Sequence, residues 1–140
     1  MTSSLISRAS AATLLVAGLA FLFAPDVILS WLAPGFPVAA AWLGQLLGAA
    51  WIGMAALNWF NRATMLGGIY GRPIVMANTA LYFISALVVL DAAQRTSAPA
   101  PLLVPGILTA VFAITYGWLL LRGPLARDFD RAPGRGRTDG

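Results

Sequence analysis

The chain has 140 residues, of which 59% are apolar and 10% are charged, with a formal net charge of +4 and a mean hydropathy of +0.80. A typical soluble protein is about a quarter charged, so this composition indicates an integral membrane protein. The sequence contains no Cys, His, Glu or Lys. It therefore lacks the usual ligands for transition metals and haem, the usual nucleophile–base pairs and the lysine of a Schiff base. We expect no metal, no cofactor and no enzymatic activity.

Four segments are long enough to cross a bilayer, which takes about 20 mostly apolar residues. They lie at about Ala9–Leu32, Val38–Phe60, Pro73–Leu90 and Leu102–Leu121. Segments rich in Gly and Pro separate them, because these residues do not continue a helix. A secretory signal is the less favoured alternative for the first segment, since its apolar run passes any small-residue cleavage site. The sequence predicts an all-α, four-helix integral membrane bundle over residues 1–121.

The arginines indicate how the bundle is oriented. Eight of the nine lie before the first helix, between the second and third, or after the fourth. Only Arg95 lies on the other side, next to Asp91 at a helical ion-pair spacing. Because positively charged loops remain in the cytoplasm, we expect both termini to be cytoplasmic and the protein to lie in the inner membrane of a bacterial cell.

The last residues, 122–140, contain five Arg and three Asp in dispersed order and no apolar face. We expect this segment to be a disordered cytoplasmic tail. Its arginines can attract anionic lipid. A solvated tail that fixes the topology is favoured over a specific docking site.

Each span carries a stripe of small or polar residues spaced three and four apart, the residues through which helices approach each other in lipid. In the second span the stripe contains the close-packing pair Gly44 and Gly48, continues through Trp51 and ends at Asn58 and Arg62. The glycine pair predicts a helix contact, either within the chain or between subunits. The other stripes are Ser10, Thr13, Ala17, Ala20 and Ala24, then Asn78, Tyr82, Ser85 and Val89, then Gly106, Thr109, Ala113 and Tyr116.

Several polar members of these stripes fall in the cytoplasmic half of the membrane, namely Thr13, Asn58, Asn78, Tyr82 and Tyr116. We expect them to form a cluster that opens toward the cytoplasm. Hydrogen bonds between helices are the favoured interpretation, because Asn, Thr and Tyr within bundles commonly bond one another. The alternative is a pocket for a lipid head group, quinone or other amphiphile, with Trp51 as its apolar wall and Arg62 binding an anionic group at its mouth. A transport path is a third interpretation.

The two carboxylates within the apolar region are predicted to lie near the outer interface. Asp26 is interpreted as a capped or solvated residue after Pro25, and Asp91 as part of a solvated helix end. No charged residue occupies the middle of a predicted span. This distribution argues against an ion-coupled transporter and against a hydrophilic pore.

Arg8 before the first helix, the FLFAPDVILSWLAPG turn region and the LLGAAWIGMAALNWFNR second helix together resemble small bacterial membrane proteins of the DoxX-like kind. The resemblance spans the four helices. It implies a four-helix bundle that sometimes acts as a membrane partner of redox or sulfur enzymes.

The leading hypothesis is a non-catalytic structural or accessory subunit whose small-residue stripes contact a partner in a membrane complex or a second copy of the chain. The alternative is a small carrier or amphiphile-binding module that uses the inner polar cluster. Expected partners are the lipid bilayer, another subunit and, for the alternative, an amphiphilic small molecule. A nucleic-acid partner is not expected.

Overall fold

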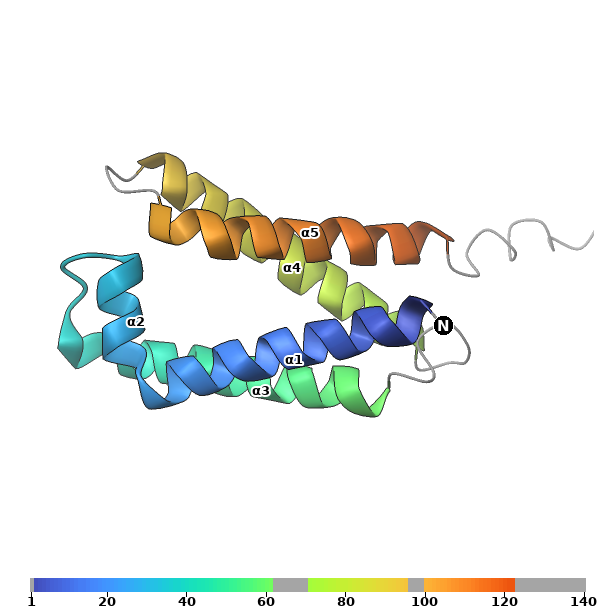
Figure 1. Cartoon of the computed structure of the whole chain (residues 1–140), viewed down its shortest axis with the longest axis horizontal. Helices are drawn as coiled ribbons and strands as arrows, with labels where there is room; N and C mark the ends of the chain where they lie inside the picture. Colours follow the sequence, from blue (N-terminus) through green and yellow to red (C-terminus); the bar gives the residue numbers. More distant parts are fainter. Residues whose placement is uncertain (1, 62–70, 96–99, 123–140) are drawn as a thin grey trace, which may run out of the picture.

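The computed structural model describes residues 2–61, 71–95 and 100–122, and the regular structure of these residues is helical throughout. The elements are α1 (Thr2–Phe23), α2 (Pro25–Leu32), the short 3-10 helix η1 (Val38–Ala40), α3 (Trp42–Phe60), α4 (Gly71–Arg95) and α5 (Ala100–Arg122) (Figure 1). Four segments are long and apolar enough to span a membrane: Ser4–Phe23, Val38–Phe60, Arg72–Arg95 and Ala100–Leu121. The predicted all-α class with four potential membrane spans is confirmed.

The first predicted helix, 9–32, is two helices in the structure. Pro25 has no N–H to donate to the carbonyl of Phe21, and its ring would clash with that carbonyl in a continuous helix. The chain therefore leaves helical geometry at Ala24 (φ −136°, ψ 51°), and Pro25 occupies the start of α2, where its fixed φ is suitable. Helix α2 turns away from the axis of α1 (Figure 1). Asp26 is thus exposed in the first turn of a separate helix, where the helix dipole favours a carboxylate.

Helix ends also differ from the predicted ones because backbone hydrogen bonding continues beyond the apolar runs. Helix α1 begins at Thr2 rather than Ala9, and α4 extends over 71–95 rather than 73–90. The longer α4 contains both members of an exposed ion pair, in which Arg95 Nε lies 2.8 Å from Asp91 Oδ2. This pair has the solvated position that its spacing indicated. The predicted tail lies outside the described residues, apart from Arg122 at the end of α5.

The spans form two helical pairs, because α1 packs along α3 and α4 packs along α5 (Figure 1). Within the first pair the two backbones are nearly in contact at Gly18 and Gly48. A Cβ atom placed on Gly48 would lie 2.6 Å from the carbonyl oxygen of Gly18. Gly44 packs against side chains instead, and a Cβ atom there would lie 3.0 Å from Leu29 and 3.1–3.2 Å from Pro25 and Phe21. Both predicted packing glycines therefore contact helices of the same chain.

Much of the apolar surface faces outward. In the most apolar 18-residue stretch of each candidate span, at most 33% of the residues are buried inside the structure. Large side chains such as Phe23, Phe60 and Ile114 are more than 70% exposed. An exposed apolar surface of this kind is unfavourable in water but suits the hydrocarbon layer of a membrane. In that layer, helices associate through close packing and polar bonds and not through the hydrophobic effect. The arrangement is that of a multi-pass membrane protein.

Candidate functional site

Two asparagines connect the helical pairs. Asn58 lies in the last turn of α3 and Asn78 in the second turn of α4, and both side chains are 0% exposed. Asn58 Nδ2 donates to Asn78 Oδ1 at 2.8 Å, and Asn78 Nδ2 donates to Asn58 Oδ1 at 2.6 Å. Asn78 Nδ2 also donates to the carbonyl oxygen of Ile74 at 2.9 Å. The two amides thus satisfy each other, as buried polar groups in an apolar surrounding require.

Helix α1 contributes two buried serines to the same network. Ser7 Oγ donates to the backbone carbonyl oxygen of Asn58 at 2.6 Å. Ser10 Oγ accepts a hydrogen bond from Asn58 Nδ2 at 3.0 Å and lies 2.7 Å from the hydroxyl of Tyr82 on α4. Either hydroxyl of that last pair can donate. Hydrogen bonds through Ser10 therefore link α1, α3 and α4.

Aromatic rings continue the network toward α5. The ring of Tyr82 stacks on Phe112, with centroids 4.7 Å apart, and on Tyr116, with centroids 5.7 Å apart. Tyr116 is 0% exposed, and its hydroxyl has no hydrogen-bond partner in the described part of the chain. One polar atom of the network is therefore left unsatisfied.

A small cavity adjoins Tyr82 between the two helical pairs. Its volume is about 80 Å³. It is lined by Thr13, Leu14, Ala17, Trp51, Leu81, Tyr82, Ser85, Pro105, Leu108 and Thr109. Pockets for cofactors and drug-sized ligands usually have about 300–1,000 Å³. This cavity can hold a few water molecules and is too small for a quinone ring with its tail.

The structure assembles most of the predicted cluster. Asn58, Asn78, Tyr82 and Tyr116 lie together, whereas Thr13 and Trp51 line the adjoining cavity. Trp51 is half-buried, and its ring is nearly perpendicular to that of Phe21, with the ring centroids 5.2 Å apart. Arg62 lies outside the described residues.

The sequence predicts a cluster that opens toward the cytoplasm, but the side chains of the cluster are buried. The two asparagines and Tyr116 are 0% exposed, and Tyr82 is 3% exposed. Apart from the Tyr116 hydroxyl, their polar atoms bond within the network, because no water in a hydrocarbon layer can replace a missing partner. The cluster is a closed network.

The sequence patterns do not identify two residues that contribute to this arrangement, Ser7 and Gly18. Ser7 preceded the predicted start of the first helix, and Gly18 was not part of the predicted stripe. The buried face of α1 follows Ser7, Ser10, Leu14, Gly18 and Phe21, with spacings of three and four. Extending the helix toward the N-terminus would have revealed this alignment.

The groups gathered here are amides, hydroxyls and aromatic rings, which exchange hydrogen bonds but include no carboxylate or imidazole. Among the described residues no three side chains of the His, Cys, Asp or Glu type come together as metal ligands do. No protein-family model matches the chain, and no curated protein or solved structure is significantly similar to it.

Proposed function

We propose that this chain is a non-catalytic subunit of a membrane assembly, with a buried polar network that holds its two helical pairs in a fixed arrangement. The reciprocal bonds between Asn58 and Asn78 carry this proposal. Each amide nitrogen donates two hydrogen bonds and each amide oxygen accepts one, all within the chain, so neither donor group is left for a ligand. A network of this kind stabilises a helix arrangement by about 0.6 kcal/mol for each bond, up to about 1.7.

The size of the interior supports a structural role over the carrier alternative. The cavity beside Tyr82 measures about 80 Å³, well below the volume of a typical ligand site. A larger amphiphile would fit there only if the helices that line the cavity moved apart. The interior therefore favours a packed scaffold.

An accessory subunit also needs a surface for its partner, and α3 offers one. Ala49 and Gly53 are exposed and lie one turn apart, and a Cβ atom on Gly53 would meet nothing within 4 Å. A pair of small residues spaced by four allows a second helix to approach closely in lipid. The resemblance to DoxX-like proteins, some of which act beside redox or sulfur enzymes, supports the same role. The arginine distribution supports cytoplasmic termini in a bacterial inner membrane.

Native mass spectrometry tests this function directly. The full chain is extracted from its own membrane in mild detergent, and the masses of intact assemblies are recorded for the natural sequence and for Gly53→Leu. Gly117→Leu is the matched control, because Gly117 on α5 also has open space around it. We expect a stoichiometric protein partner or second copy that is lost in Gly53→Leu and kept in Gly117→Leu. A natural chain that emerges as a bare monomer, or an assembly that survives in both variants, would contradict the proposal.

A further inference from the structure

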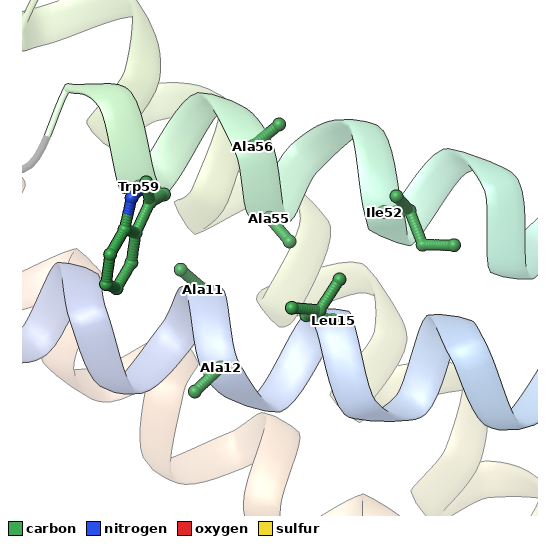
Figure 2. A pocket seen from close by; sticks show the side chains of 7 residues that line it. All are labelled: Ala11, Ala12, Leu15, Ile52, Ala55, Ala56 and Trp59. Carbon is green, nitrogen blue, oxygen red and sulfur yellow. The ribbon is translucent and has the colours of Figure 1, made fainter.

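A groove runs between α1 and α3 on the outer surface of this helical pair. Figure 2 shows it from the outside, with the ribbons of α4 and α5 behind. Its volume is about 370 Å³. It is lined by Ala11, Ala12 and Leu15 of α1 and by Ile52, Ala55, Ala56 and Trp59 of α3. Four of these seven residues are alanines, so the depth of the groove comes from the absence of larger side chains.

The position and shape of the groove match one chain of a membrane lipid. Trp59 closes one end, near the C-terminus of α3, and Ile52 lies two turns further along the helix (Figure 2). Trp side chains are enriched where the hydrocarbon layer meets the head groups. The groove thus extends from the interface inward along the helices, as an acyl chain does. Its volume lies within the range of specific ligand sites.

The cationic side chain of Arg8 is placed near the end of the groove that Trp59 closes. Arg8 precedes Ala11 by three residues and Ala12 by four, so its side chain leaves α1 on the face that lines the groove. It is exposed, and within the described part of the chain it forms no ion pair. A guanidinium group binds phosphate oxygens through two parallel hydrogen bonds, and its flexible stem lets it reach the head-group layer.

We propose that the groove between α1 and α3 binds one anionic phospholipid of the surrounding bilayer, with an acyl chain along the alanines and the phosphate at Arg8. The apolar groove and the cation at its end together match the two parts of this ligand. A second copy of the chain fits less well. The described carboxylates, Asp26 and Asp91, lie at the opposite end of the bundle, so a parallel copy brings neither of them to Arg8. The lipid site is independent of the proposed role as a subunit.

The test is to measure which lipids the full chain retains. The protein is reconstituted in nanodiscs with equal amounts of phosphatidylglycerol and phosphatidylcholine, released in the mass spectrometer, and analysed for bound lipid. Arg8→Gln removes the cation, with Arg95→Gln at the opposite end as the charge control. The double variant Ala12→Leu/Ala56→Leu fills the groove, and Ala80→Leu on α4 is the volume control. All of these positions are exposed, so folding is expected to survive; circular dichroism verifies this.

We expect the natural chain to retain one phosphatidylglycerol molecule in preference to phosphatidylcholine. Arg8→Gln should lower this preference about fivefold, the effect of one arginine near an anionic surface. The groove-filling variant should lose the bound lipid of either kind, whereas both controls should match the natural chain. Equal retention in Arg8→Gln and Arg95→Gln would overturn the proposal. It would also be overturned if filling the groove displaced a second protein chain and left the lipid bound.

Discussion

Asn58 and Asn78 donate to each other, through N–O distances of 2.8 and 2.6 Å, across the interface between the two helical pairs. Because the same amide of Asn58 also donates to Ser10, hydrogen bonds connect three of the four spans. The pairs approach each other less closely than the helices within each pair. Their mutual position therefore depends on this network to a greater extent than on close backbone packing.

The two buried tyrosines should respond in opposite ways to loss of their hydroxyls. Tyr82→Phe removes a hydrogen bond to Ser10 and should lower the free energy of unfolding by about 0.6–1.7 kcal/mol. Tyr116→Phe removes a buried hydroxyl that has no partner in the described chain, so it should be neutral or stabilising by up to about 1–3 kcal/mol. Unfolding in increasing dodecyl sulfate, followed by circular dichroism, measures both. Equal destabilisation by the two variants would mean that the Tyr116 hydroxyl has a partner after all.

Alanine substitutions at two glycines of α3, Gly48 and Gly53, should also affect stability differently. A Cβ atom on Gly48 would lie 2.6 Å from the backbone oxygen of Gly18, so Gly48→Ala forces the helices apart. We expect a loss of about 1–3 kcal/mol, the usual cost of overpacking. Gly53→Ala meets open space and should leave the stability of the isolated chain unchanged or slightly higher. The same unfolding assay applies, and a harmless Gly48→Ala would show that α1 and α3 are less tightly packed than described.

The helical class, the number of spans and the grouping of polar residues could be predicted because each follows from local patterns. Long apolar runs give the spans, and spacings of three and four bring Asn78 and Tyr82 onto one face. Gly48 could likewise be identified as a close-packing position. These features need no knowledge of the tertiary structure.

Other features of the fold depend on tertiary contacts, which the spacing of apolar and polar residues does not reveal. The break at Pro25 was concealed because the residues after it are as apolar as those before it. Ser7 was missed because apolarity marks the membrane core and says little about where a helix begins. That the cluster is closed depends on how Asn58 pairs with Asn78, and a stripe of polar residues is equally compatible with an open pocket.

The orientation can be tested cleanly because the chain has no cysteine of its own. Single cysteines are introduced at exposed positions near opposite ends of the bundle, as Leu5→Cys and Gln94→Cys. With cytoplasmic termini, a membrane-impermeant maleimide added to intact cells should label Gln94→Cys only. Leu5→Cys should become labelled after the cells are permeabilised. Labelling of Leu5→Cys in intact cells would reverse the orientation.

The most direct test of the structural role is a double-mutant cycle on the asparagine pair. Asn58→Leu or Asn78→Leu alone leaves the other amide buried without its partner and should cost about 1–3 kcal/mol. Replacing both removes the unsatisfied group, so the double variant should remain folded and cost less than the sum of the single changes.

The free energies of unfolding of the four proteins are compared in the dodecyl sulfate assay. We expect a coupling free energy of about 0.6–1.7 kcal/mol between the two positions. If the single changes add within about 0.3–0.5 kcal/mol, the two amides do not act as a pair, and the account of this network as the connection between the helical pairs is wrong.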